Sequence, residues 1–392
     1  MPKPASTIHI ALDAPPGTGK EGEEARMSLS AVVRVGRHLF LGSDETASLE
    51  RVTDLGGGRF GEHRTYPLSE LLDLAGGEDG EVDIEGFAWD PPYLWVTGSH
   101  GRKRGKIKHD MADDEGARAL AKIKVEKNRY LLARIPLEED ADGGGLVPRR
   151  SCADPRDPVR TITAARVKGR GTRSALLRAL RRDEHVGPFM HLPGKDNGFD
   201  IEGLEVRDGR VYLGLRGPVL RGWAVVLELL PRDARREGRL RLAPVEEDGG
   251  RYRKHFLDLD GLGIRELAAD GDDLLVLAGP TMGVRAPAAV FRWTDGLATE
   301  RGRVVRGAEL ERIAELPHDV QGGADHPEGM CRFDVEGAEH CVLVMYDSAA
   351  PHRRDATGVL GDVFSLPRRG RLAGIAARFF APSGDGETSE GA

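Results

Sequence analysis

The chain has 392 residues, of which 31% are charged and 5% aromatic, with 52 glycines and a formal net charge of −7 at pH 7. A mildly acidic chain is not attracted as a whole to nucleic acid or to an anionic membrane, so neither partner is predicted. Many glycines and few aromatic residues suit short strands joined by turns better than a helical bundle. The three cysteines, Cys152, Cys331 and Cys341, show no paired spacing and are predicted to be reduced thiols.

Residues 1–27 are predicted to hold one strand, around Ile8 to Leu12, followed by a Pro/Gly-rich linker. Ala14 to Glu21 resembles a nucleotide-binding loop only superficially, because it lacks the first glycine and the Ser or Thr after the lysine. The N-terminus has no apolar signal segment, and no later run approaches the ~18 apolar residues of a membrane span. We therefore expect a cytoplasmic protein.

One segment then recurs along the chain. Its clearest copy, Asp200 to Gly217, predicts two strands around a tight turn, because apolar residues alternate on both sides of Asp208-Gly209. Related copies begin near residues 28, 83, 264 and 326. Repetition at this period is typical of propellers and solenoids. We therefore predict an all-β chain folded as a β-propeller over residues 28–381, with blades starting near 28, 83, 200, 264 and 326.

The step between the second and third copies is twice as long as the others. We favour five blades with helical insertions in blade two, and six blades, one of them eroded, is the alternative. An outer strand of blade two is predicted at Pro188 to Leu192. The N-terminal strand is expected to pair with the last blade and close the ring. Residues 382–392 are rich in Gly, Ser and Glu and are expected to be disordered.

The repeated position near the start of each first strand is acidic in four copies. Because first strands line the central channel of a propeller, these side chains are predicted to form a ring. Its members are Ser30, Glu85, Glu202, Glu266 and Glu328. Four carboxylates repel each other unless a cation lies among them, and several oxygen ligands suit calcium, or magnesium. In the alternative interpretation each glutamate accepts hydrogen bonds from backbone N–H groups of the neighbouring blade and binds no metal.

The loops that follow the second strands surround the same mouth of the channel, and four of the five are basic. Arginine binds oxyanions bidentately, so the candidates for holding an anionic ligand are Arg102, Arg216, Arg221 and Arg285. The candidates for proton transfer are His100, Asp44 and Asp347. For any one of these arginines, the alternative is a solvated basic surface.

The motifs carry a resemblance. Ser-Asp-Glu at 43, Asp-Ile-Glu-Gly at 83 and 200, Leu-Arg-Gly-Pro at 215 and Pro-Glu-Gly-Met at 327 resemble a bacterial family known as a domain of unknown function. The serine and glutamates of the inner strands are also similar to those of calcium-activated nucleotidases, five-bladed apyrases with an axial calcium. The Glu-Gly strand starts further resemble phytase-like and esterase-like propellers.

The nucleotidase resemblance implies that Ser30, Glu85, Glu202 and Glu328 are calcium ligands. Glu266 departs from that pattern, which can have a second serine there, so the resemblance does not extend to all five positions. Such enzymes cleave nucleoside di- and triphosphates.

Two hypotheses of different classes follow. The first is a metal-dependent hydrolase, with calcium or magnesium, that acts on a phosphate-containing or other anionic small molecule at the axial face. The second is a non-catalytic propeller that binds a ligand or a protein partner on that face, with a structural glutamate ring.

Overall fold

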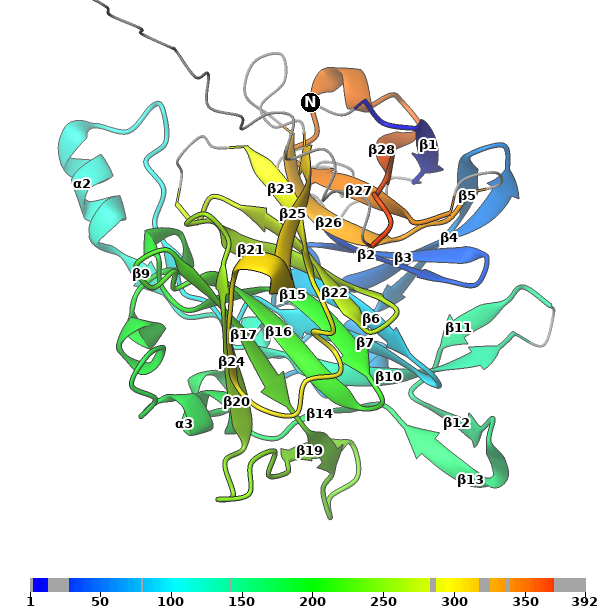
Figure 1. The fold of residues 1–392 in the computed structure, drawn as a ribbon, viewed down its shortest axis with the longest axis horizontal. Coiled ribbons are helices and arrows are strands. Elements are labelled where there is room, and N and C mark those ends of the chain that lie inside the picture. Colours follow the sequence, from blue (N-terminus) through cyan, green and yellow to red (C-terminus); the bar gives the residue numbers. More distant parts are fainter. Residues whose placement is uncertain are drawn as a thin grey trace, which may run out of the picture.

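The structure is a computed structural model that describes residues 3–12, 28–78, 80–140, 143–282, 287–316, 325–335 and 339–369. Strands dominate the described residues, and the helices are short (Figure 1). The predicted all-β class is therefore confirmed. The predicted tail, 382–392, lies outside the described residues, as does Arg285.

Five antiparallel hairpins carry the repeated segment. They are β2 (Leu29–Val35) with β3 (His38–Ser43), β6 (Ile84–Asp90) with β7 (Tyr93–Gly98), β15 (Asp200–Arg207) with β16 (Arg210–Gly217), β21 (Gly263–Asp270) with β22 (Asp273–Gly279), and β26 (His326–Arg332) with β27 (Cys341–Asp347). The first strands contact one another in a closed series, β2 with β6, β6 with β15, β15 with β21, β21 with β26, and β26 with β2. The arrangement of the sheets is propeller-like.

Outer strands continue each hairpin away from this inner series. They are β4 (Ser48–Gly56) and β5 (Arg59–Pro67) after β3, β10 (Leu132–Glu139) and β14 (Ala165–Val167) after β7, β17 (Trp223–Leu229), β20 (Tyr252–Asp258) and β24 (Arg303–Val305) after β16, β23 (Ala288–Trp293) and β25 (Leu310–Leu316) after β22, and β28 (Gly358–Ser365) after β27. Short strands pair as β8 (Lys103–Arg104) with β9 (Ile123–Lys124), β11 (Leu146–Pro148) with β10, β12 (Ser151–Asp154) with β13 (Asp157–Thr163), and β18 (Pro231–Asp233) with β19 (Arg239–Leu242).

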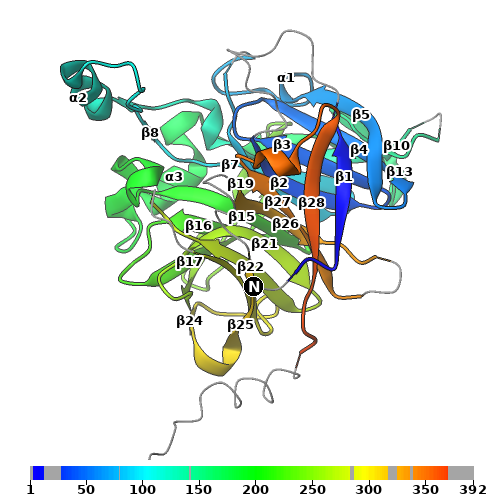
Figure 2. The same ribbon diagram turned by 90° about the horizontal axis from the view of Figure 1, so that it is seen from above.

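The N-terminal strand joins the first and last sheets. β1 (Ser6–Ala11) runs antiparallel to β28 and parallel to β5 (Figure 2). The pairing predicted for this strand is therefore confirmed, and it leaves neither neighbouring strand as an open edge at this point.

The α-helices of the described residues are α1 (Leu68–Leu71), α2 (Asp113–Ala121) and α3 (Ala175–Leu180). Both α2 and α3 lie between β7 and β15 in sequence, and α2 projects away from the sheets (Figure 1). The outer strand predicted at Pro188 to Leu192 is wrong, because Gly187–His191 is a 3₁₀ helix and β14 extends this sheet instead. A short apolar run does not distinguish strand from helix, and Pro188 favours the first turn of a helix. No helix in the described part of the chain is long and apolar enough to cross a membrane.

The hydrophobic core lies between adjacent sheets. Trp95 of β7 packs in one cluster with Leu204 of β15, and Tyr212 of β16 packs in another with Leu267 of β21. Glycines let the inner strands approach this closely. A Cβ added to Gly86 would lie 2.7 Å from Leu204 Cβ, so a larger residue there would push β6 and β15 apart.

Candidate axial carboxylate site

Each hairpin has a register shift near the start of its first strand. At this shift, one residue of the first strand has no paired residue on the second strand. This residue is Ser30 in β2, Glu85 in β6, Glu202 in β15 and Glu328 in β26. In β21 this residue is Arg265, and Glu266 pairs with Leu277. A shift of one residue moves a side chain to the opposite face of a strand. The structure therefore corrects the alignment of the repeat, because Arg265 rather than Glu266 occupies the repeated position in β21.

Glu266 instead connects two strands. It is fully buried, and its Oε1 accepts the backbone N–H groups of Leu204 in β15 and Leu267 in β21, each at 2.9 Å. Burial raises the pKa of Glu266 well above its ordinary value. These contacts correspond to the metal-free interpretation of the glutamates, in which a carboxyl group holds the neighbouring strand.

Arg265 and Arg216 supply positive charge within the ring. Arg265 Nη1 lies 3.0 Å from Glu202 Oε2 and 2.5 Å from Glu328 Oε1. Arg216 Nη1 pairs with Glu202 Oε1, and its Nη2 lies 3.6 Å from Asp200 Oδ2. Two guanidinium groups thus hold Glu202. Because Arg216 is 6% exposed and paired within the protein, it does not extend toward solvent as an anion-binding side chain would.

Asp83, two residues before Glu85, has its own basic partners. Arg129 Nη2 pairs with Asp83 Oδ2, and Lys103 Nζ lies 3.8 Å from Asp83 Oδ1. Both basic groups also contact Glu81. Asp83 is buried, so this pairing compensates part of the cost of removing its charge from water.

Seven carboxyl groups near this end of the inner strands interact electrostatically in a connected group. We call them the axial carboxylate cluster: Asp44, Asp83, Glu85, Asp200, Glu202, Glu328 and Asp347. Four basic side chains pair with its members, namely Lys103, Arg129, Arg216 and Arg265. Acidic groups therefore outnumber these basic partners, and the cluster has a net negative charge when fully ionised.

The protein makes several of these carboxyl groups hard to ionise. Burial raises the pKa of Asp44 to about 8, with additional effects of Asp347 and Asp83. Burial, opposed by Arg216 and supported by Glu202, raises the pKa of Asp200 to about 7. The pKa values of Glu85 and Glu328 are raised well above the ordinary range, mainly by burial. Near neutral pH, ionisation of the whole cluster requires a compensating cation.

Some oxygen atoms of the cluster are left without partners. Asp44 Oδ1 and Asp200 Oδ1 are buried and accept no hydrogen bond within the described structure. No hydrogen bond or ion pair connects Glu85 to another described residue, although its side chain is buried. Such oxygens are suitable in kind as ligands of a hard cation.

The fit to calcium or magnesium is limited to part of the predicted ring. Among the described residues, no three His, Cys, Asp or Glu side chains are already placed to hold a metal ion together. Ser30 Oγ donates to the Ile84 carbonyl oxygen at 2.5 Å, and Glu202 is held by arginines. The carboxyl groups of the cluster that fit a cation by donor type and form no ion pair with a described arginine are Asp44, Glu85 and Asp347, whereas Glu328 pairs with Arg265.

The candidates for proton transfer differ in their surroundings. His100 is 2% exposed, its Nε2 lies 2.9 Å from the Leu131 carbonyl oxygen, and burial lowers its pKa to about 4. It is packed inside the protein, with its ring 5.9 Å from that of Tyr130. Asp44 and Asp347 belong to the cluster and are partly accessible to solvent. Asp347 also accepts hydrogen bonds from the backbone N–H and hydroxyl group of Ser348.

Of the remaining arginines, Arg102 Nη2 lies 3.3 Å from His191 Nδ1, and Arg221 is exposed.

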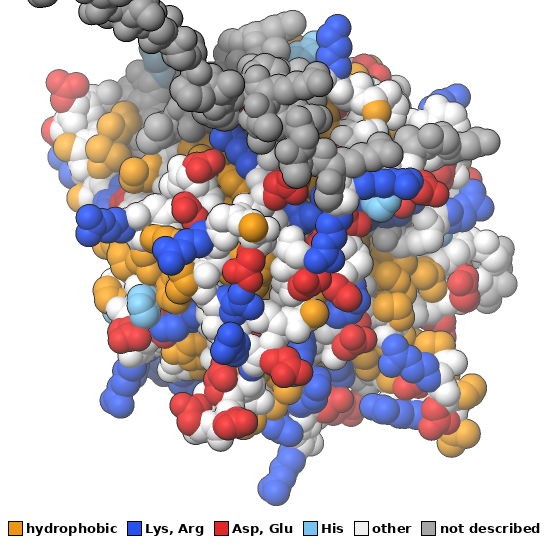
Figure 3. All heavy atoms as spheres, in the orientation of Figure 1, with side chains coloured by type: hydrophobic (Ala, Val, Ile, Leu, Met, Phe, Trp, Pro, Cys, Tyr) orange, Lys and Arg blue, Asp and Glu red, His pale blue; other side chains and the backbone are white. Residues whose placement is uncertain are grey.

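The residues that sequence analysis missed are Asp83, Asp200, Arg129 and Arg265. The two aspartates stand in the repeated Asp-Ile-Glu-Gly motif, so the repeat itself contained the signal. Arg129 had no such signal, because it lies outside the repeat and meets Asp83 only in the folded chain. Figure 3 shows acidic and basic side chains interspersed on the face in view.

Comparison with solved structures gives only distant similarities. A glutaminyl cyclase from Myxococcus xanthus is 11% identical, with 93% of this chain and 97% of that chain covered and a TM-score of 0.41. A GH43 β-1,3-galactosidase is 12% identical, with 91% and 60% covered and a TM-score of 0.39. The PQQ-bound aldose sugar dehydrogenase from Streptomyces coelicolor is 12% identical, with 92% and 99% covered and a TM-score of 0.32. We draw no activity from similarities at this level.

A sequence comparison with curated proteins gives no match. A family model, by contrast, matches residues 28–362, which is most of the chain and includes all five hairpins. The family is described as "Protein of unknown function (DUF3616)", and the chain belongs to it.

Proposed function

We propose that the axial carboxylate cluster is the active site of a metal-dependent hydrolase, with calcium or magnesium, that acts on a phosphate-containing or other anionic small molecule. The observation that carries this proposal is that seven carboxyl groups, each buried or half-buried, have four basic partners among the described residues at one end of the inner strands. Charge of this kind is costly to bury without a ligand, and perturbed carboxyl groups gathered at one place are typical of functional sites.

We also infer that the sheets form five blades. The inference is supported by the five hairpins and by the closed series of contacts among β2, β6, β15, β21 and β26. In this arrangement the strand starts converge on one axis, which brings carboxyl groups from distant parts of the sequence together. The resemblance of the inner strands to calcium-activated nucleotidases agrees with this proposal in blade number and in the use of axial oxygen ligands.

Glu85 and Asp347 would hold the cation, together with Glu328, which also pairs with Arg265. A divalent cation bound there supplies neutralising charge and polarises a phosphoryl or carbonyl oxygen. The protein's own contribution is proton transfer. With its pKa raised to about 8, Asp44 is mostly protonated at neutral pH and can donate a proton to a leaving group. Exposed Arg221 and half-buried Arg102 are then the described arginines that can approach an anionic substrate.

Glu85→Gln is the sharpest test of this site. Glu85 has no hydrogen bond within the described residues, so the substitution removes an ionisable carboxyl group of nearly the same size without breaking a hydrogen bond. Calorimetric titration with calcium and with magnesium should give saturable binding to the parent, at least tenfold weaker binding to Glu85→Gln, and unchanged binding to the exposed control Glu247→Gln. Cation-dependent phosphate release from nucleoside di- and triphosphates should decline in parallel.

The second candidate is a non-catalytic propeller that binds an anionic ligand or a protein partner on the same face. The specific observation in its favour is that Arg216 and Arg265 already neutralise Glu202 and Glu328, while Glu266 binds backbone. A parent protein that binds neither cation and releases no phosphate would reject the hydrolase and favour this second function.

A further inference from the structure

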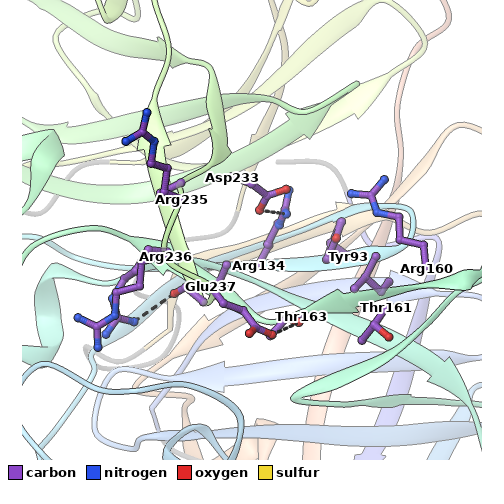
Figure 4. Close-up of a pocket in the computed structure, with 14 residues that line it drawn as sticks. Tyr93, Arg134, Arg160, Thr161, Thr163, Asp233, Arg235, Arg236 and Glu237 are labelled. Atoms are coloured by element: carbon purple, nitrogen blue, oxygen red, sulfur yellow. Dashed lines mark hydrogen bonds and ion pairs between the residues drawn. The ribbon is translucent and has the colours of Figure 1, made fainter.

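A cavity rich in arginine lies at the outer edge of the second sheet, away from the inner strands. Its volume is about 320 Å³, within the roughly 300–1,000 Å³ of small-molecule pockets. Five arginines and two carboxylates line it, along with Tyr93. The arginines are Arg134, Arg160, Arg235, Arg236 and Arg239. We call this cavity the arginine pocket (Figure 4).

The pocket forms where a hairpin from one sheet joins its neighbour. β18 and β19 follow β17 of the third sheet in sequence, yet β19 pairs in parallel with β14 of the second sheet. The connection over residues 234–238 forms one wall, and Arg160 of the β12–β13 hairpin lies on another. A second cavity of about 300 Å³ adjoins the same connection and shares Arg236 and Arg239. Three separate parts of the chain thus bring their arginines to one place.

Two of these arginines are fixed by contacts with the protein. Arg134 lies over the Tyr93 ring at 4.1 Å and pairs with Asp233 at 2.6 Å. Arg239 pairs with Asp73. Each of the two arginine side chains is 13% exposed, so together they form an ordered base for the pocket.

The other three arginines are available to a ligand. Arg235 and Arg236 are exposed and form no ion pair with any described residue. Arg160 is 60% exposed, and the nearest carboxylate oxygen, Asp154 Oδ2, is 3.9 Å away. Glu237 accepts a hydrogen bond from the Thr163 hydroxyl group at 3.0 Å and forms no ion pair with a described arginine, and the five arginines of the lining outnumber its two carboxylates. The pocket therefore combines a fixed base with exposed guanidinium groups around it.

A further arginine lies behind the pocket. Arg166 of β14 is buried opposite Arg239 of β19, and its pKa is lowered to about 10, first by burial and then by Arg239, while Asp73 opposes this effect. Crowding of cations is unfavourable in the free protein, and an anion between them would relieve it. Guanidinium groups bind phosphate and sulfate oxygens bidentately, which a spherical chloride ion does not reproduce.

We propose that the arginine pocket binds a small molecule that carries phosphate or sulfate groups. The site is distinct from the axial carboxylate cluster and does not depend on the hydrolase proposal. Its volume accommodates a ligand larger than a single phosphate ion, and Arg160, Arg235 and Arg236 approach from two hairpins, which suits a ligand with two anionic groups.

Calorimetric titration with inorganic pyrophosphate, in the presence of EDTA, tests this proposal. EDTA prevents binding of pyrophosphate through a divalent cation at the axial cluster. The informative variant is Arg235→Gln/Arg236→Gln, and its matched control is Arg232→Gln/Arg241→Gln. Arg232 and Arg241 face each other across β18 and β19, outside the lining of the pocket, so both variants lose two positive charges from one hairpin.

We expect saturable binding of pyrophosphate to the parent, binding at least tenfold weaker to Arg235→Gln/Arg236→Gln, and a change of about twofold or less in the control. Sulfate should compete, whereas sodium chloride at equal ionic strength should not. Absence of saturable binding to the parent would overturn the proposal. Equal losses in both variants would also overturn it, because they would indicate general attraction to the surface. Pyrophosphate binding should persist in Glu85→Gln, which separates this proposal from the axial one.

Discussion

Glu85, Glu202 and Glu328 occupy the same position of three inner strands, but their partners differ. Glu202 lies between two arginines, Glu328 is held by Arg265, and Glu85 has no such partner. The repeat therefore specifies where a carboxyl group stands, and the neighbouring strands decide its charge state. The three glutamates therefore differ in their ion-pair partners, and they do not form a ring of equivalent ligands.

Asp44→Asn tests the raised pKa at a single residue. Asp44 titrates at about 8 in the folded protein and at about 4 when unfolded. The folded state therefore keeps its proton longer, and ionisation of Asp44 costs stability as pH rises through this window. We expect Asp44→Asn, relative to the parent in EDTA, to gain up to about 5 kcal/mol of stability between pH 4 and pH 8, since each unit of pKa difference corresponds to about 1.4 kcal/mol.

Urea denaturation at a series of pH values measures this difference. Glu247→Gln, which removes an exposed carboxylate, should show a constant offset over the same range. A pH-independent offset in Asp44→Asn as well would mean that Asp44 has an ordinary pKa in the folded protein.

At the scale of elements, the register shift in the first strands decides which side chains reach the axis. In β21 the shift places Arg265 where the other strands have serine or glutamate, and turns Glu266 toward the backbone of β15. The two consecutive residues thus have different structural roles. Arg265 pairs with carboxylates of β15 and β26, and Glu266 connects β21 to β15.

Glu266→Ala should destabilise the fold by about 2–4 kcal/mol, because it leaves two buried backbone N–H groups without an acceptor. Glu266→Gln keeps an oxygen acceptor and, like the protonated acid favoured by burial, is neutral. We expect Glu266→Gln to remain within about 1 kcal/mol of the parent. Urea denaturation of both variants is the measurement. A glutamine variant as unstable as the alanine variant would show that the negative charge is required, as a cation ligand would be.

At the scale of the whole molecule, the sheet series is joined through its N-terminal strand. β1 supplies a partner to β28 and to β5, although these two strands are nearly 300 residues apart in sequence. Ile10 is fully buried in this junction, opposite Val359 and Phe60. The first and last sheets should therefore unfold together.

Ile10→Asp places an unpaired charge in this junction, and we expect a loss of stability of about 3–5 kcal/mol. Ser6→Asp puts the same charge at an exposed position of β1 and should have little effect. Urea denaturation monitored by tryptophan fluorescence and by circular dichroism should give one coincident transition. A separate early transition in Ile10→Asp would indicate that the junction unfolds independently of the remaining sheets.

Local patterns in the sequence sufficed for the all-β class, the five hairpins and the pairing of β1 with β28. Alternating apolar residues around turns such as Asp208-Gly209 determine a hairpin without help from distant parts of the chain. The resemblance to a family of unknown function is likewise confirmed by the family model. The outer strand predicted at Pro188 to Leu192 failed, because a short apolar run leaves the choice between strand and helix to its surroundings.

The sequence by itself thus determined the repeat, the strands and the carboxyl groups at the starts of β6, β15 and β26. Only the tertiary structure decided which of these groups are paired. Arg129 meets Asp83, and Arg265 meets Glu202 and Glu328, through contacts between residues 46 to 63 positions apart or on different sheets. Likewise, the arginine pocket exists only because β19 joins β14. The physical reason is that the repeat acts within one hairpin, whereas ion pairing and burial depend on what the neighbouring hairpins place beside it.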